Sequence, residues 1–165
     1  MNWSKLRPQL TAAAYDQHYD WMGQALALAR TAGEEGEIPV GAVIVDQQGH
    51  CLARAANRKE RDQDPTAHAE LLALRLASQH RQHWRLEDCI LYVTLEPCPM
   101  CTGAILQARL GLLVYGAADP KTGTIHTVLN LPDSPASNHC LPSITGIRER
   151  ECRQLLQDWF AQRRR

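Results

Sequence analysis

The sequence predicts an α/β protein of three layers, in which helices cover both faces of a central mixed sheet of about five strands. Two observations predict this fold class. Short apolar runs of strand length alternate with segments that have the helical period of 3.6 residues. The run at residues 40–45 is almost continuously apolar, as in a strand that is buried on both faces. A chain of 165 residues also suits one core, so we expect residues 1–165 to form a single domain.

The first elements are a helix and a hairpin. Residues 1–14 show no clear period, so we expect a flexible N-terminal segment there. Over residues 16–31 apolar side chains recur at helical spacing and predict a helix; they are Tyr19, Met22, Leu26 and Ala29. A polar loop at 33–37 follows, and we expect its acidic side chains to be solvated. The strand at 40–45 and a second strand at 51–56 flank turn residues, which predicts a hairpin.

Two further helices and two further strands come next. Asp64-Pro65 has the form of a helix start, with an N-cap followed by a proline in the first helical position. The strand predicted at 90–94 leads into Cys98, where Pro97 and Pro99 bracket the start of the next helix. A fourth strand is predicted at 112–116. Strands that alternate with helices imply a mainly parallel sheet, whose functional sites lie at the strand carboxyl ends.

The last third of the chain is predicted to be mostly loop, followed by a helix. Residues 118–147 are rich in Gly, Pro, Asn and Asp, with a helical turn expected at 125–129 and a short strand at 141–145. From residue 148 to residue 165 apolar side chains recur on one face, which predicts an amphipathic, basic C-terminal helix.

Charge and cysteine usage limit the possible partners and compartment. Eighteen basic and eighteen acidic side chains cancel, so an RNA partner would need a local patch. The arginines at 148–165, which surround Trp159 and Phe160, are one candidate, although basic residues also suit any helix C-terminus. No stretch has the length of a membrane helix or signal peptide, so we expect no membrane partner. The cysteines lack the spacing of a disulfide framework, so we expect a reducing cytoplasm.

One histidine and one pair of cysteines predict a metal site. His68, Cys98 and Cys101 supply an imidazole and two thiolates, which are the ligands that zinc prefers. Three protein ligands leave a fourth position open, as in catalytic zinc sites. Glu70 follows the histidine by two residues and is suited to carry protons. The joint pattern H-x-E…P-C-x-x-C is the signature of zinc nucleobase deaminases.

Each part of this pattern has a simpler explanation when it is taken alone. A Cys-x-x-Cys pair also occurs as a thioredoxin-like redox centre. A single histidine at a helix start is most often structural. The combination with Glu70 favours the metal site over both alternatives, with one Zn²⁺ per subunit.

These stretches resemble the cytidine-deaminase-like superfamily and, within it, the bacterial tRNA-specific adenosine deaminases. The likeness runs from about residue 19 to residue 164. It rests on Ile38–Val43, Asn57-Arg58, Asp64–Glu70, Leu91–Cys98, Asp119–Gly123 and Asn138-His139. The first metal motif is shared with guanine and cytosine deaminases, whereas the Asp-x-Lys-Thr-Gly segment and the aromatic, basic C-terminal helix favour tRNA.

The resemblance implies a cytidine-deaminase-like fold and a role for each matching residue. It implies that His68, Cys98 and Cys101 bind zinc and that Glu70 is the proton shuttle. The residues that it implies for RNA are Val40 and Asn57 around the flipped nucleoside, Asp119, Lys121 and Asn138 near the flanking nucleotides, and Phe160, Arg163 and Arg164 against the anticodon loop. It also implies a homodimer.

The function that the resemblance implies is hydrolytic conversion of adenosine to inosine at the wobble position of a tRNA anticodon. Two alternatives stay open at this point. One is a free-base guanine or cytosine deaminase of the same superfamily. The other is a zinc-stabilised RNA-binding module without catalytic activity.

Overall fold

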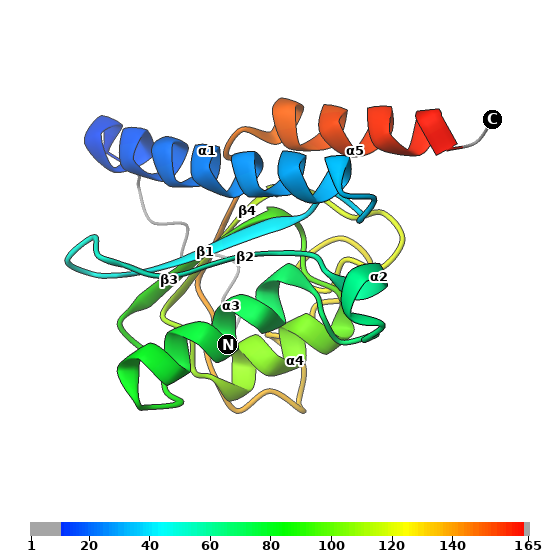
Figure 1. Cartoon of the computed structure of the whole chain (residues 1–165). Helices are drawn as coiled ribbons and strands as arrows, with labels where there is room; N and C mark the ends of the chain where they lie inside the picture. Colours follow the sequence, from blue (N-terminus) through cyan, green and yellow to red (C-terminus); the bar gives the residue numbers. More distant parts are fainter. Residues whose placement is uncertain (1–10, 164–165) are drawn as a thin grey trace.

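The computed structural model describes residues 11–163, which form three layers around one five-stranded sheet (Figure 1). The strand order is β2-β1-β3-β4-β5. The strands are β1 (Gly41–Asp46), β2 (Cys51–Ala56), β3 (Cys89–Leu95), β4 (Leu112–Ala117) and β5 (Ser143–Thr145). β1 runs antiparallel to both of its neighbours, whereas β3, β4 and β5 are parallel to one another. The predicted mixed sheet is therefore confirmed.

Two pairs of helices cover the two faces of the sheet (Figure 1). α1 (Ala12–Glu34) and α5 (Glu149–Arg163) pack on one face, and α3 (Ala69–Arg81) and α4 (Pro99–Gln107) pack on the other. The short helix α2 (Lys59–Asp62) lies in the connection between β2 and α3. Among residues 11–163, no helix combines the length and the apolar character that crossing a membrane requires.

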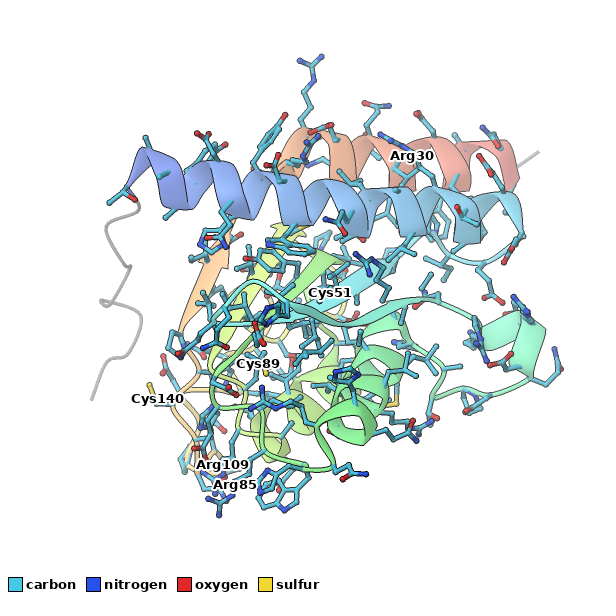
Figure 2. All side chains as sticks on the ribbon, turned by 60° about the vertical axis from the view of Figure 1, so that its left-hand side comes forward. Arg30, Cys51, Arg85, Cys89, Arg109 and Cys140 are labelled. Carbon is cyan, nitrogen blue, oxygen red and sulfur yellow. The ribbon has the colours of Figure 1, made fainter. Side chains whose placement is uncertain are left out.

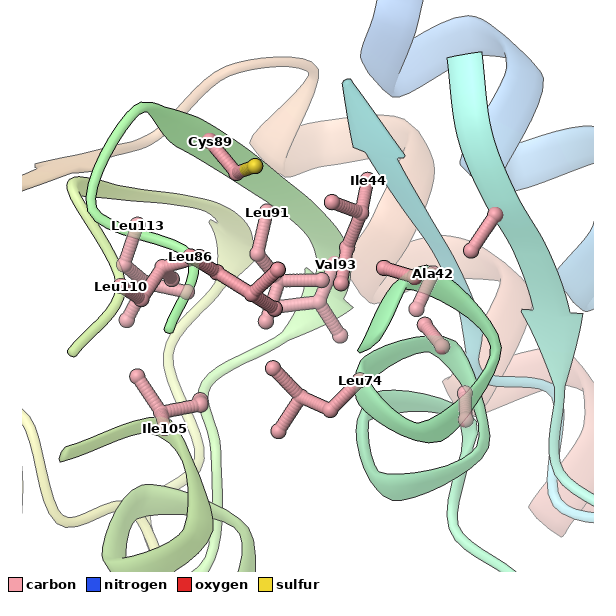
Figure 3. Packing of buried hydrophobic residues seen from close by; sticks show 14 of the residues in the cluster. Ala42, Ile44, Leu74, Leu86, Cys89, Leu91, Val93, Ile105, Leu110 and Leu113 are labelled. Atoms are coloured by element: carbon pink, nitrogen blue, oxygen red, sulfur yellow. The ribbon is translucent and has the colours of Figure 1, made fainter. Parts of the chain in front are cut away.

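β3 contributes to the core on both of its faces. Leu91 and Val93 pack with the side chains of α3 and α4, among them Leu74 and Ile105 (Figure 3). Tyr92, on the opposite face, packs with side chains of α1. Every residue of β1 is buried as well, which confirms the strand predicted from its continuous apolar run.

The first helix begins earlier than predicted. Thr11 is its N-cap, and the Thr11 hydroxyl accepts a hydrogen bond from the backbone N–H of Ala14 at 3.2 Å. The expectation of a flexible segment at 1–14 is therefore wrong for residues 12–14, because a threonine cap and three alanines favour helix. Residues 1–10 lie outside the described residues.

α3 begins later than predicted, at Ala69 rather than at Pro65. The carboxylate of Asp64 accepts hydrogen bonds from the N–H and the hydroxyl of Thr66, both at 2.7 Å, and so forms a local turn. Such short side chains compete with helix by bonding to nearby backbone, which is why the capping pattern misplaced the start. His68 is the N-cap instead, with extended backbone.

The strand directions bring four segments to one edge of the sheet, which we call the carboxyl edge. β2, β3 and β4 all end there, and β1 begins there because it runs the opposite way. Two hydrogen bonds join these segments, from Asn57 N–H to the Val40 carbonyl at 3.0 Å and from Gly41 N–H to the Thr94 hydroxyl at 3.2 Å. This is the edge at which the sequence predicts the site.

Candidate metal centre and substrate pocket

His68, Cys98 and Cys101 come together at the carboxyl edge. The Nδ1 atom of His68 lies 3.6 Å from Sγ of Cys101 and 3.8 Å from Sγ of Cys98. A tetrahedral zinc ion, with Zn–S of about 2.3 Å and Zn–N of about 2.0 Å, separates its sulfur and nitrogen ligands by about 3.5 Å. The three side chains therefore fit a zinc ion. Within residues 11–163 no fourth His, Cys or acidic side chain joins the group, so one position is left for a small molecule.

Two of the three ligands are the N-caps of the helices that follow them. His68 precedes α3 and Cys98 precedes α4, and neither side chain bonds to the N–H groups of its own helix. Both side chains are therefore directed to the metal position instead. Cys101 lies three residues after Cys98, in the first turn of α4, and so faces the same way. Pro99 opens α4, as predicted from the sequence.

The surroundings of Cys98 favour the ionised form of its sulfur. A hydrogen bond from the Cys101 thiol, with a further one from the His68 ring, lowers the pKa of Cys98 to about 4 although burial acts to raise it. The positive ends of the helix dipoles of α3 and α4 act in the same direction. A thiolate is the form of cysteine that binds zinc.

Glu70 lies beside the ligands without joining them. It is in the first turn of α3 and only 4% exposed. Burial raises the pKa of its carboxyl group to about 7. A carboxyl group with such a pKa both accepts and donates protons near neutral pH. The arrangement therefore combines a three-ligand metal site with a separate proton carrier.

Asn57 links the end of β2 to the start of α3, the helix that follows the metal ligand His68. Its amide oxygen accepts a hydrogen bond from the backbone N–H of Ala69 at 2.9 Å. No described residue accepts from its NH₂ group, so this group is the one that remains to donate to a ligand. Val40, which the Asn57 backbone contacts, is 5% exposed and packs into the core at the same edge. The structure thus brings Val40 and Asn57 to the carboxyl edge, where the metal ligands lie.

The connection that leads to His68 is fixed by a residue that sequence reasoning missed. Glu37 is 2% exposed, and its carboxylate accepts the N–H groups of Glu60 and Arg61 at 3.2 and 2.8 Å. These N–H groups belong to the start of α2. The expectation that the acids at 33–37 are solvated is therefore wrong for Glu37, because it caps a helix that lies 23 residues further along the chain.

Asp119 and Lys121 follow β4 and also lie at the carboxyl edge. The Asp119 carboxylate accepts hydrogen bonds from the N–H of Lys121 at 2.9 Å and from the hydroxyl of Thr122 at 2.6 Å. This carboxylate therefore shapes its own turn. Lys121 is exposed on the turn that results.

Asn138 lies elsewhere. Its backbone carbonyl accepts a hydrogen bond from the guanidinium of Arg109, in the turn that precedes β4. Because β4 ends at the carboxyl edge, this turn lies at the opposite end of the sheet. Arg109 and Cys140 are labelled near each other at that end of the molecule in Figure 2. The structure therefore does not bring Asn138 beside the metal ligands.

The end of α5 presents an aromatic and a basic side chain. Trp159 donates from Nε1 to the carbonyl of Gly33 at 3.1 Å, which fixes the end of α5 to the end of α1. The Arg163 guanidinium stacks on the Trp159 ring at 3.8 Å, and Phe160 meets the same ring edge-on and is 41% exposed. Arg164 lies outside the described residues.

Sequence reasoning also missed Glu96, which directly precedes the Pro97-Cys98 turn. Its side chain is 1% exposed. Burial acts to raise its pKa, but hydrogen bonds from the Thr127 hydroxyl and from several backbone N–H groups outweigh burial and hold the pKa below its usual value. The one sequence feature that could have indicated its role is the position of an acidic residue directly after an apolar strand. Its donors lie 23 to 31 residues away, where no local pattern reveals them.

Comparison with known proteins gives a consistent result. The family model for the cytidine and deoxycytidylate deaminase zinc-binding region matches residues 15–117. The tRNA-specific adenosine deaminase of Bacillus subtilis is 43% identical over 145 residues, which cover 88% of this chain and 89% of that protein. The corresponding protein of Haemophilus influenzae is 46% identical over 143 residues, which cover 87% of this chain and 83% of that protein.

A solved structure has the same fold. It comes from a study of A-to-I editing by tRNA:A34 deaminases at the wobble position of transfer RNA. Its TM-score against this chain is 0.81 at 42% sequence identity, with 83% of this chain and 99% of that chain covered.

Proposed function

Because the chain belongs to the family defined by the cytidine and deoxycytidylate deaminase zinc-binding region, we propose that it converts adenosine to inosine at the wobble position of a tRNA anticodon. The observation that carries this proposal is the juxtaposition of His68, Cys98 and Cys101 with the buried carboxyl group of Glu70. It occurs in a chain that is 43–46% identical to tRNA-specific adenosine deaminases over most of its length.

The chemistry needs a nucleophile and a proton carrier. His68, Cys98 and Cys101 would hold a zinc ion, which would lower the pKa of a water molecule toward about 7 and so supply the nucleophile. Glu70 takes a proton from that water while the oxygen attacks C6 of adenine. Glu70 then gives this proton to N1 of the ring, takes a second proton from the new C6 hydroxyl group and passes it to the amino group, which leaves as ammonia while the C6 carbonyl forms. Proton transfer by a positioned group contributes about 10²–10⁴ in rate.

The pocket must hold an adenine that has left its stack. Flipping a base costs a few kcal/mol, and least in a strand that is already single, such as an anticodon loop. The NH₂ group of Asn57 donates a hydrogen bond to an acceptor of the flipped nucleoside, and Val40 forms an apolar wall. The exocyclic amine would then lie beside Glu70 and the three metal ligands at the carboxyl edge.

RNA contacts outside the pocket come from two surfaces. Lys121, on the turn that Asp119 shapes, reaches the backbone of the flanking nucleotides. Phe160, Arg163 and Arg164 meet the anticodon loop by stacking and by phosphate contacts. Asn138 takes part if the bound RNA extends to the opposite end of the sheet.

We also propose that the protein is a homodimer that acts in the cytoplasm, on the resemblance to its family. Its mass in solution at micromolar concentration tests the dimer. A mass of about 18.5 kDa, that of one chain, would count against it.

The test of the proposed function is direct. The zinc-loaded protein is incubated with an anticodon stem-loop that carries adenosine at the wobble position, and the nucleosides are separated after digestion. We expect inosine and an equal amount of ammonia. Ammonia from free guanine or cytosine, with none from the stem-loop, would favour a free-base deaminase. Binding of the stem-loop without ammonia would favour an inactive RNA-binding module.

A further inference from the structure

The carboxylate of Glu96, which follows β3, bonds to both ends of the loop at 119–127. Its Oε2 atom accepts the N–H of Asp119 at 3.1 Å and the hydroxyl of Thr127. Its Oε1 atom accepts three successive N–H groups, those of Ile125 at 3.0 Å, His126 at 2.8 Å and Thr127 at 3.1 Å. Five donors from the loop at 119–127 therefore converge on one buried side chain.

The same loop is attached to the chain on the other side of the Glu96-Pro97 bond. The Pro97 carbonyl accepts from the N–H of Thr124 and from its hydroxyl, both at 3.1 Å. The Thr124 hydroxyl also lies 2.8 Å from that of Thr102 in α4. The two residues that precede the metal ligand Cys98 are thus both bonded to the loop at 119–127.

No described Lys, Arg or His side chain forms an ion pair with Glu96. Its negative charge is compensated by N–H and O–H donors of one loop. Hydrogen bonds to an ionised acceptor are roughly twice as strong as neutral ones. Five of the hydrogen bonds that hold the loop therefore end on this carboxylate, and the position of the loop depends on its charge as well as on its shape.

Gly123 shows how closely the loop surrounds the carboxylate. A Cβ atom at this position would lie 2.4 Å from Oε2 of Glu96 and 2.6 Å from the carbonyl oxygen of Asp119. Any side chain would collide with the acceptor that orders the loop. The close approach of Gly123 to Glu96 is a second observation, besides the hydrogen bonds, that the loop packs tightly against the Glu96 carboxylate.

We propose that Glu96 is a positioning residue, which fixes the RNA-contacting turn at Asp119–Lys121 in register with the metal ligand Cys98. The inference rests on the proposed function for the role of Lys121 in RNA binding. Within residues 11–163, the carboxylate of Glu96 bonds to the loop and not to the metal ligands or to Asn57. It acts through the loop, and so determines how the nucleotides beside the target are held relative to the zinc.

The substitution Glu96→Gln tests this with little change in shape. The remaining oxygen keeps the three N–H groups of residues 125–127, but the new NH₂ group faces the N–H of Asp119, and two donors cannot bond. We expect faster amide hydrogen exchange at residues 119–123 and one zinc ion per chain, as in the wild type. The control Glu87→Gln makes the same chemical change on an exposed side chain next to Arg85.

Kinetics with the wobble-adenosine stem-loop separate positioning from a general structural role. We expect the Glu96→Gln variant to raise KM about tenfold, the factor that loss of one hydrogen bond to a charged group gives, with kcat within about threefold. Lys121→Ala should also raise KM in the wild type. In the Glu96→Gln background it should add little, because the turn is already released.

Three results would overturn the proposal: unchanged exchange at 119–123, an unchanged KM, or additive effects of the Lys121 and Glu96 substitutions. If Glu96→Gln does not fold, Thr127→Val removes one donor to the same carboxylate and should change exchange and KM in the same direction. Exchange needs no substrate. A wild type that makes no inosine would therefore refute the proposed function, while the exchange data would still decide whether Glu96 holds the loop.

Discussion

The amide oxygen of Asn57 and the backbone N–H of Ala69 lie 2.9 Å apart, so the residue that directly follows the edge strand β2 also satisfies the first N–H of α3. The oxygen of this side chain thus serves the fold, and the proposed function assigns its NH₂ group to the substrate. The two roles can be separated by substitution.

Asn57→Asp keeps the oxygen and removes the NH₂ donor, whereas Asn57→Ala removes both. We expect kcat/KM for the stem-loop to fall about 10- to 100-fold in both variants, the cost of one hydrogen bond in a buried site. The alanine variant also leaves the Ala69 N–H without its acceptor, so its Tm should fall by a few degrees. Equal turnover in the wild type and the aspartate variant would exclude the donor role.

Glu70→Gln should retain zinc and lose turnover, because the proposed mechanism assigns proton transfer to this carboxyl group and the metal group consists of His68, Cys98 and Cys101. We expect kcat to fall by about 10²–10⁴, the usual contribution of a positioned acid and base. Metal analysis and inosine formation on the same sample check both halves of the prediction. A variant that turns over at the normal rate would refute the assignment.

Cys101→Ser should release the metal, because it removes one of three protein ligands. A metal ion that binds tightly to the folded state alone contributes about 4 kcal/mol to the free energy of unfolding. Its loss therefore lowers Tm by about 10 °C in a domain of this size. Cys140→Ser is the matched control, since Cys140 is exposed at the other end of the sheet from the ligands. The control should keep its zinc, its Tm and its activity.

Arg163→Ala should weaken binding of the stem-loop uniformly across sequences. Removing one side chain that binds a phosphate reduces the slope of log K against log salt concentration by about 1. Arg153→Ala is the control on the same helix, where the guanidinium pairs with Glu149. Identical salt slopes for Arg163→Ala and the wild type would place the RNA on another surface.

Acid should weaken the ion pair of Arg81 and Asp88. The hydrogen bond from Arg81 lowers the pKa of Asp88 below its usual value. A lowered folded-state pKa means that the pair stabilises the protein above the unfolded pKa of about 3.9 and stops doing so as the pH falls through the folded value. Asp88→Asn should therefore lower Tm slightly at pH 7, by an amount typical of solvent-screened pairs, and less at pH 3. An equal difference at both pH values would contradict this.

The parts of the molecule that were predictable from sequence are those set by short-range patterns. The zinc ligands follow from residue types and spacing within two short stretches, and the start of α4 follows from Pro99. The start of α3 was misplaced because the hydrogen bonds from Thr66 to Asp64 compete with helix locally. Periodicity and capping rules do not rank such competing bonds.

Glu37 and Glu96 could not be recognised from sequence for a different reason. Each is an acidic residue buried by backbone N–H groups that lie more than twenty positions away. The strand order brings their donors near, and a local sequence pattern does not reveal the strand order. Asn138 illustrates the same limit, since the loop at 118–142 carries it to the turn of Arg109 and away from the metal.

The strand directions also separate the two ends of the sheet, the carboxyl edge that carries the metal ligands and the opposite end. The turns at the opposite end lie away from the three metal ligands, and they include the exposed residues Gln47 and Gln48 between β1 and β2. A peptide tag or a fused reporter placed in that hairpin would lengthen a turn without reaching the catalytic groups. The architecture therefore offers an attachment point that leaves the reaction side free for a large RNA.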